Sequence, residues 1–262
     1  PMLSLRTCCL LALATSAVFA VPAVPPLGND PAGSWLSYAV FKAENNQPIT
    51  ALNTSWIVPS EPKVKFGSNA PGWWFGIQTA SGGGALIQPI LAWDYMGHEY
   101  SIFNACFDWN DQSWHTSPET YKVQPGDRIT SSVTYRPADN SYDMYIEADG
   151  KSITTNYKIE AAQGKTPESV AYFVLEHQPD LCSAYPGSDV CTFENITVAV
   201  ADKIVDSPTW EAKQEQPACK SEATIVDPHT IKFTWQASKE AETAGLPPLG
   251  SFPNKWGTGR HQ

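Results

Sequence analysis

The stretch Arg128-Ile129-Thr130-Ser131-Ser132-Val133-Thr134-Tyr135 is β-prone, and its larger side chains recur at intervals of two or four. That spacing is the period of a strand with one face buried. A turn, Pro125-Gly126-Asp127, precedes it, and Asp149-Gly150 separates two further β-prone runs, 142–147 and 152–159, in the pattern of a tight hairpin. This part of the chain therefore predicts antiparallel strands joined by short turns.

Similar short runs recur over most of the 262 residues, between turn signals and without a long amphipathic helix. They predict an all-β fold, an antiparallel two-sheet β-sandwich of the concanavalin A-like or jelly-roll type. The length suits one all-β domain with a sizeable core, which we place at residues 35–236. The runs are Trp35–Phe41, Ser55–Val58, Trp73–Thr79, Ala85–Leu91, Tyr100–Phe107, Arg128–Tyr135, Tyr142–Glu147, Ser152–Ile159, Val170–Glu176, Cys191–Val200 and Thr230–Trp235.

The two ends of the chain differ from the middle. Residues 1–20 open with a positively charged start around Arg6, and the apolar stretch that follows is too short to span a membrane. Small residues before position 21 favour cleavage after Ala20. We therefore expect a secretory signal peptide over 1–20, an extended lead-in over 21–34, and a secreted, extracellular protein. The Lys/Glu-rich and then Pro/Gly-rich composition of 237–262 predicts a weakly ordered C-terminal tail.

Charge and missing motifs narrow the possible functions. There are 17 Lys and Arg against 27 Asp and Glu, a formal net charge of −10, which disfavours phosphate backbones and anionic lipid surfaces as partners. No G-x-S-x-G, H-E-x-x-H or D-T-G motif occurs, and the five His show no ligand spacing. We expect a monomer with no metal, no cofactor, no nucleic-acid partner and no membrane partner.

In an exported chain, four cysteines remain after the signal peptide is removed, and four cysteines allow three pairings. Cys182 and Cys191 flank a turn-rich stretch, so we expect a local bridge between them. Cys106 would then pair with Cys219 and tie the C-terminal segment to the body of the domain.

Two sequons add a second expectation that depends on export. Asn53-Thr54-Ser55 and Asn195-Ile196-Thr197 are N-glycosylation acceptors in a secreted chain. We expect Asn53 and Asn195 to be glycosylation sites.

Seven segments in order between about residues 53 and 200 carry a family resemblance. They are Ser55-Trp56-Ile57-Val58-Pro59, Trp74-Phe75-Gly76-Ile77, Ala85-Leu86-Ile87-Gln88, Phe107-Asp108-Trp109, Pro125-Gly126-Asp127-Arg128-Ile129, Ala171-Tyr172-Phe173-Val174-Leu175-Glu176 and Thr192-Phe193-Glu194-Asn195. Each is short, but their order and spacing together resemble the glutamic peptidases, or eqolisins. These are mostly fungal, secreted, acid-active proteases with a β-sandwich fold.

The resemblance implies a secreted acid endopeptidase whose catalytic residues are Gln88 and Glu176. Glu176 ends an apolar run, where partial burial would raise its pKa toward the working pH, so it can take a proton from an attacking water and hand it to the departing amine. The Gln88 side-chain NH₂ can stabilise the oxyanion, and losing such a donor typically costs about 3–4 kcal/mol of barrier. The implied partner is a protein or peptide substrate. The implied substrate-binding residues are Trp74, Gln78, Asp108 and Trp109.

The chain also departs from the family pattern. Gln78 stands where family members carry Asp, and Pro89-Ile90 replaces the usual Thr-Gly after the catalytic Gln. An alternative function is therefore a lectin-like or polysaccharide-active sandwich that binds carbohydrate or acts as a glycoside hydrolase or lyase, with Asp108, Asp94 or Glu99 as a second carboxylate near Glu176. A catalytically inactive relative is the third possibility. The peptidase hypothesis requires Gln88 and Glu176 to project from adjacent strands into one groove, close enough to hold a water between them.

Overall fold

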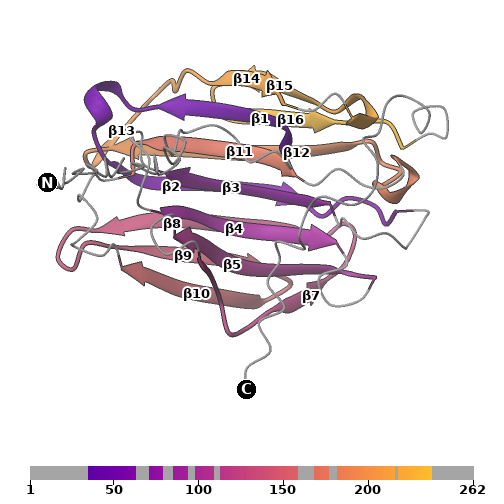
Figure 1. Ribbon diagram of the computed structural model, residues 1–262, viewed down its shortest axis with the longest axis horizontal. Coiled ribbons are helices and arrows are strands. Elements are labelled where there is room, and N and C mark those ends of the chain that lie inside the picture. Colours follow the sequence, from indigo (N-terminus) through magenta and orange to yellow (C-terminus); the bar gives the residue numbers. More distant parts are fainter. Residues whose placement is uncertain are drawn as a thin grey trace, which may run out of the picture.

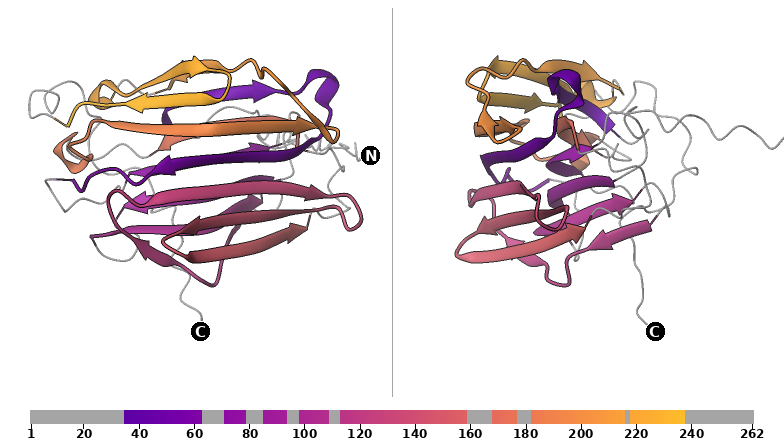
Figure 2. Two further views of the ribbon diagram at one scale, coloured as in Figure 1. Left: turned by 180° about the vertical axis from the view of Figure 1, so that it is seen from behind. Right: turned by 90° about the vertical axis from the view of Figure 1, so that its left-hand side faces the viewer.

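The computed structural model describes residues 35–62, 71–78, 85–93, 98–108, 113–158, 168–176, 182–215 and 218–237. Within these ranges the chain forms two antiparallel sheets that pack face to face (Figure 1), and Figure 2 shows the two layers from the side. This confirms the predicted all-β sandwich. The expected signal peptide and lead-in lie outside the described residues, as do residues 238–262 of the expected tail. No helix in the described part is long and apolar enough to cross a membrane.

Sheet A carries the two candidate catalytic residues. Its strands are β1 (Trp35–Lys42), β3 (Gly72–Gln78), β4 (Ala85–Trp93), β5 (Tyr100–Asp108), β6 (Ser113–Thr116), β7 (Tyr121–Val123), β11 (Val170–Glu176) and β14 (Glu211–Gln214). They are ordered β14-β1-β11-β3-β4-β5-β6, and β7 also pairs with β5. Strand β11, which comes late in the chain, therefore lies between the early strands β1 and β3. As a result, Glu176 on β11 and Gln88 on β4 belong to the same sheet.

Sheet B forms the second layer. Its strands are β2 (Ile49–Ile57), β8 (Arg128–Arg136), β9 (Ser141–Ala148), β10 (Lys151–Lys158), β12 (Val190–Val200), β13 (Lys203–Ile204), β15 (Glu222–Asp227) and β16 (Thr230–Thr234). They are ordered β10-β9-β8-β2-β12-β16-β15, and β13 also pairs with β12. Asp149 and Gly150 join β9 to β10 with φ angles of 51° and 70°, so the predicted tight hairpin is confirmed.

The main core lies between the two sheets. Side chains alternate between the two faces of a strand, so every second residue of each sheet enters this layer. Five fully buried aromatic residues fill its centre: Trp56 and Phe193 from sheet B, and Trp73, Phe75 and Phe173 from sheet A. Phe75 stacks on Phe173 with ring centroids 5.7 Å apart, and Trp56 packs against both Phe75 and Phe193.

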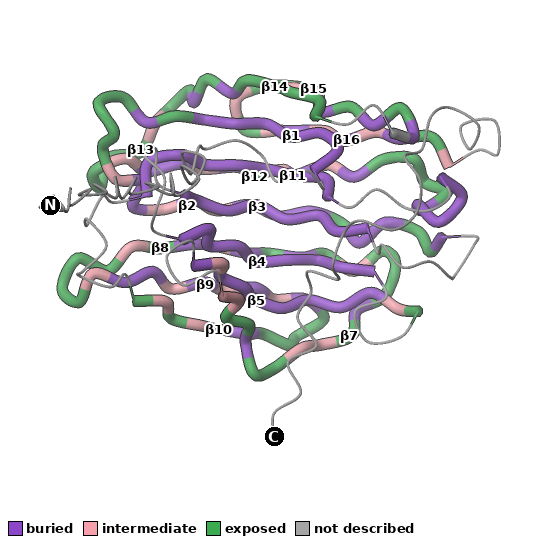
Figure 3. Tube along the Cα trace, in the orientation of Figure 1, coloured by how far each residue is buried: buried purple, intermediate pink, exposed green. Residues whose placement is uncertain are grey.

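The two sheets differ in how far their outer faces are buried. In β8 of sheet B, buried and solvent-accessible residues alternate, whereas every residue of β3, β4 and β11 in sheet A is buried (Figure 3). The outer face of sheet A carries a second apolar cluster of its own, which includes Trp35, Trp74 and Tyr172. Runs buried on both faces lose the alternating pattern, which explains why these three strands are almost continuously apolar in sequence.

The disulfide differs from the expected pairing. Cys182, in the short 3-10 turn Cys182–Ala184, bonds to Cys219, in the turn Ala218–Lys220, with 5.4 Å between their Cα atoms. Cys106 and Cys191 are buried thiols on β5 and β12. The expected Cys182–Cys191 and Cys106–Cys219 bridges are therefore wrong. Cys191 lies within β12, paired with Phe233 of β16, so strand pairing takes it into the main core instead of the turn.

Candidate active site

Gln88 and Glu176 lie on the same face of sheet A. Gln88 alternates in phase with Leu86 and Ile90, which belong to the outer apolar cluster, and Glu176 is in phase with Val174 of that cluster. Both candidate catalytic side chains therefore belong to the face of sheet A that points away from sheet B. The two residues are far apart in the chain, since Gln88 is on β4 and Glu176 is the last residue of β11. The pairing of strands within sheet A is what places them on one face.

Strand β3 lies between β4 and β11 in sheet A and so separates Gln88 from Glu176. Glu176 is opposite Gly72 on β3, and the register of the β3–β4 pair places Gln88 beside Gly76. The offset is four residues, about 13 Å along the strands and about 9–10 Å across them. The expectation of adjacent strands is therefore wrong: Gln88 and Glu176 share a face of sheet A, but β3 and the side chain of Trp74 lie between them. A one-residue change of register on either strand would have placed one side chain in the core.

Trp74 occupies the space between them on β3. It is opposite Val174 and Ile90, so Gln88 lies two residues away on one neighbouring strand and Glu176 two residues away on the other. Its indole Nε1–H donates to Glu176 Oε2 at 2.7 Å, and both side chains are buried. A hydrogen bond to a carboxylate is stronger than one between neutral groups, so Trp74 holds one oxygen of Glu176 in place.

Two further aromatic side chains fix this arrangement. Trp35 packs edge-on against Trp74 with ring centroids 5.1 Å apart, and it packs against Tyr172 at the same distance. Trp35 also pairs with Glu176 in the β1–β11 register. The indole that donates to the carboxylate is thus held by its own aromatic neighbours, which limits the motion of Glu176.

Tyr185, from outside sheet A, packs in the main core against Trp73 and Trp235. Tyr185 follows the disulfide turn and is fully buried. Burial, with a smaller contribution from the negative charge of Glu176, raises the pKa of Tyr185 well above its usual range. Its phenol therefore stays protonated in acid and at neutral pH.

The Gln88 amide is buried at 1% exposure, and neither its Nε2 nor its Oε1 has a hydrogen-bond partner among the described residues. Leaving a buried amide unpaired costs about 1–3 kcal/mol, and native folds keep few such groups without a reason. Gly76 beside it has no side chain, and a Cβ there would fall on the Ile87 carbonyl oxygen and within 3.2 Å of Gln88 Cβ. The glycine thus allows the close approach of β3 to the Gln88 strand.

The remaining predicted site residues have mixed positions. Gln78, the last residue of β3, is in phase with Trp74 on the same outer face and is buried. Asp108 is in phase with Cys106 on the core side of β5 and accepts a hydrogen bond from Tyr157 of β10 at 2.5 Å. The structure therefore does not bring Asp108 to the Gln88 face. Trp109 lies outside the described residues.

Two residues of this site were absent from the sequence prediction: Trp35 and Tyr172. Trp35 and Tyr172 stand on apolar runs that carry no motif, and only the period of two places them on the Glu176 face. The sequence also gives no signal for the place of Tyr185 in the main core, because this position depends on a turn closed by a disulfide that the spacing did not predict.

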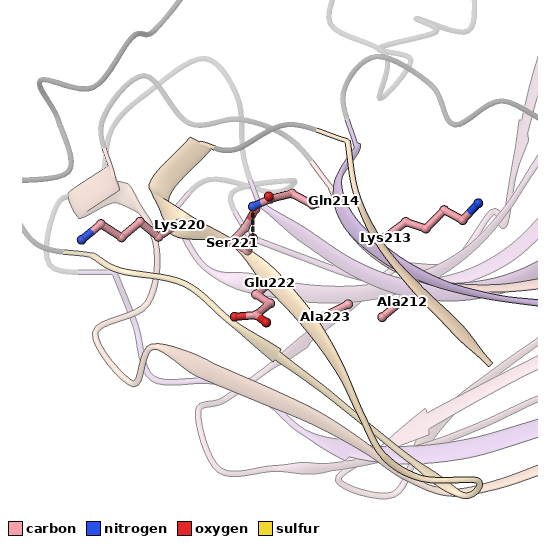
Figure 4. A pocket seen from close by; sticks show the side chains of 7 residues that line it. All are labelled: Ala212, Lys213, Gln214, Lys220, Ser221, Glu222 and Ala223. Atoms are coloured by element: carbon pink, nitrogen blue, oxygen red, sulfur yellow. Dashed lines mark hydrogen bonds between the residues drawn. The ribbon is translucent and has the colours of Figure 1, made fainter. Parts of the chain in front are cut away.

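Two surface hollows lie elsewhere. One, of about 520 Å³, lies between the edge strands β14 and β15, and Gln214 Nε2 crosses it to donate to the Ser221 carbonyl oxygen at 2.6 Å (Figure 4). Lys213, Lys220 and Glu222 give it mixed charge, and neither Gln88 nor Glu176 lines it. The other, of about 640 Å³, lies on sheet B and is lined by residues of β2, β8, β9 and β12. Among the described residues, no group of three or more His, Cys, Asp or Glu could hold a metal ion.

Comparison with known proteins supports the fold. No family model and no curated protein matches this chain. Two crystal structures of scytalido-glutamic peptidase, each with a transition state analog, superpose with TM-scores of 0.54 and 0.55 at 17% and 18% identity. Both alignments cover 77% of this chain and 98% of the peptidase. At this identity the likeness establishes the sandwich fold alone. A toad ovary galectin complexed with thio-digalactose, at 15% identity over 62% of this chain and 98% of the galectin, has a TM-score of 0.36, too low to support an argument.

Proposed function

We propose that the protein is a secreted acid endopeptidase of the glutamic-peptidase type. One observation carries the proposal. Glu176 and Gln88 lie on one face of sheet A, on the two strands that flank Trp74. The Glu176 carboxylate is buried and held by an indole N–H, and the buried Gln88 amide has no hydrogen-bond partner among the described residues. An acid–base group and a neutral donor are the two functions that acid-catalysed amide hydrolysis needs.

The reaction would run over Trp74. The indole of Trp74 holds Oε2 of Glu176, and the carboxylate would accept a proton from water as that water attacks the amide carbon. The C–N bond then breaks, and the same carboxyl gives the proton to the departing amine. Proton transfer of this kind typically contributes about 10²–10⁴-fold.

Gln88 would stabilise the negative oxygen that forms during attack. Its NH₂ has no partner to give up among the described residues, so donation to the oxyanion costs no existing hydrogen bond. A glutamine amide is also neutral at every pH, whereas a histidine donor would be charged in acid. The chain's excess of carboxylates suits the same medium, because protonation at low pH relieves their repulsion.

The residues on the outer face of sheet A favour peptide hydrolysis over glycoside hydrolysis, which uses two carboxyl groups. Glycosidases need a second carboxyl about 5–10 Å from the first. Of the three candidates, Asp108 points to the other side of the sheet and Glu99 forms an ion pair with Lys122, while Asp94 lies outside the described residues. Trp35, Trp74 and Tyr172 instead make the surroundings of Glu176 on this face apolar and buried. An extended peptide crossing β4, β3 and β11 would meet both Gln88 and Glu176.

The test is hydrolysis of denatured protein and of a mixed peptide library at about pH 3–5. Glu176→Gln should abolish cleavage while leaving the fold intact. The matched control is Glu194→Gln, which changes a surface carboxylate on sheet B that contacts Arg128 at 3.5 Å and should leave activity unchanged. The proposal fails if the well-folded wild-type protein cleaves nothing, or if Glu176→Gln still cleaves at the wild-type rate. Binding to glycans by an inactive wild type would instead support the lectin-like alternative.

A further inference from the structure

The two predicted glycosylation sequons meet in one hollow on the outer face of sheet B. Asn53 and Asn195 are 142 positions apart in the chain, yet both line the same hollow of about 640 Å³. The strands β2 and β12 that carry them are neighbours, and Asn53 pairs directly with Thr197. The lining consists of Asn53, Thr54, Ser55, Arg128, Thr130, Ser131, Ser132, Tyr145 and Asn195.

The side chains of the two sequons are hydrogen-bonded to each other. Asn53 Nδ2 donates to Thr197 Oγ1 at 2.8 Å, and Asn195 Nδ2 donates to Ser55 Oγ at 3.0 Å. Each asparagine amide therefore contacts the hydroxyl of the other sequon. An asparagine amide has two N–H groups, so each retains one that is not used in this contact.

The two asparagines differ in exposure and backbone conformation. Asn195 is exposed and has a φ of 55°, at the irregularity where the β12–β2 register shifts between Glu194 and Thr197. Asn53 is only partly exposed and lies in regular strand, paired with Ser132 of β8 on one side and Thr197 on the other. Because Asn195 is exposed at an irregularity of its strand and Asn53 is partly covered in regular strand, Asn195 is the better placed attachment point.

The hollow has the chemistry of a sugar-binding surface. Its lining offers serine and threonine hydroxyls, two asparagine amides, the Arg128 guanidinium and the Tyr145 phenol, which match the hydroxyl and acetamido groups of a sugar. Arg128 also donates to Ser55 Oγ at 3.3 Å, and Tyr145 donates to Glu147, so these polar groups are already oriented.

We propose that Asn195 carries a single N-linked glycan whose first sugars lie in this hollow, and that Asn53 stays unmodified because the hollow holds only one glycan. The donor is a lipid diphosphate-linked oligosaccharide. The bond between sugar C1 and the diphosphate oxygen breaks, and the lipid diphosphate leaves with the electron pair. Asn195 Nδ2 bonds to C1 and loses one proton to a base. The remaining N–H keeps the hydrogen bond to Ser55.

Site occupancy tests the first part of the proposal. The full chain is secreted from a yeast host, and its glycans are released with an amidase in ¹⁸O-water, which converts each modified asparagine to a labelled aspartate. The expected result is label at position 195 and none at 53. Label at 53 alone, at both positions or at neither would overturn the proposal. Asn195→Gln should be secreted without glycan, and Asn53→Gln should keep the wild-type glycan.

Stability tests whether the first sugar is bound in the hollow. Trimming the glycan to a single sugar with an endoglycosidase should leave Tm unchanged. Protein made while synthesis of the lipid-linked donor is blocked has the same sequence and no glycan, and its Tm should be lower by about 2–4 °C. Equal Tm values for trimmed and unglycosylated protein would overturn the proposal that the first sugar binds in the hollow. They would not affect the result on which asparagine is modified.

Discussion

Removing the disulfide gives the prediction with the best-defined magnitude. Cys182 and Cys219 are 37 residues apart in the chain. In the chain-entropy model, closing a loop of that length removes about 13 cal/mol/K from the unfolded state, or about 3.8 kcal/mol at 25 °C. The variant Cys182→Ser/Cys219→Ser should therefore lose about 4 kcal/mol of unfolding free energy, and its Tm should fall by about 8–16 °C.

The assay is thermal unfolding with and without a reductant. Wild type should lose stability on reduction, and the Cys182→Ser/Cys219→Ser variant should not respond to the reductant. The matched control is Cys106→Ala/Cys191→Ala, which changes the two buried thiols outside the disulfide and should retain the full response. If the control loses its response, or the Cys182→Ser/Cys219→Ser variant keeps it, the disulfide assignment is refuted.

Three further predictions concern the site and its pH dependence. Trp74→Phe removes the donor to Glu176, so kcat should fall by about 10–100-fold with little change in KM. Gly76→Ala places a Cβ against the Ile87 carbonyl oxygen and should destabilise the fold by about 1–3 kcal/mol or more in urea unfolding. Glu168 is fully buried, and burial, with a smaller contribution from a nearby acidic side chain, raises its pKa well above 4.5. Because its folded pKa is raised, its contribution to stability is fully present below the unfolded pKa and is lost as pH rises, so the wild type should be less stable at pH 7 than at pH 4.

Each of these has its own control. Trp73→Phe removes an indole N–H that has no partner among the described residues, so activity per folded molecule should stay near wild type, in contrast to Trp74→Phe. Gly150→Ala changes a hairpin glycine of positive φ that has open space around it, so it adds backbone strain without a steric contact. Comparing it with Gly76→Ala tests whether the contact with the Ile87 carbonyl oxygen explains the loss of stability at position 76. Glu168→Gln cannot ionise and should flatten the loss of stability between pH 4 and 7. An unchanged pH profile in Glu168→Gln would contradict the assignment.

The sequence predicted the fold well where side chains alternate. The run from Arg128 to Tyr135 has the period of two that β8 shows in its burial, and Asp149-Gly150 forms the predicted hairpin. The short strands β6, β7, β13, β14 and β15 were not predicted. Several of them are solvent-exposed and hold their place by pairing with a neighbour, which leaves no apolar pattern to detect.

The candidate site was predictable in part. The motif order identified Gln88 and Glu176, and the structure places both on one face. Their separation by β3 was not predictable, because strand order within a sheet is set by tertiary pairing. Asp108 shows the same limit, since its motif position does not reveal that register turns it toward Tyr157 in the other sheet. The cysteine pairing likewise depends on which turns meet at the end of sheet B.

The most direct test of the catalytic pair is a double-variant cycle in kcat/KM at about pH 4 on one peptide substrate. Gln88→Ala should lower the rate by about 10²–10³-fold, and Glu176→Gln should lower it more. If the two groups act on one transition state, the double variant should be no slower than Glu176→Gln within about tenfold. If the loss of kcat/KM in the double variant equals the product of the two single-variant losses, the account of a shared active site on the outer face of sheet A is contradicted. A Gln88→Ala variant as active as wild type would contradict it as well.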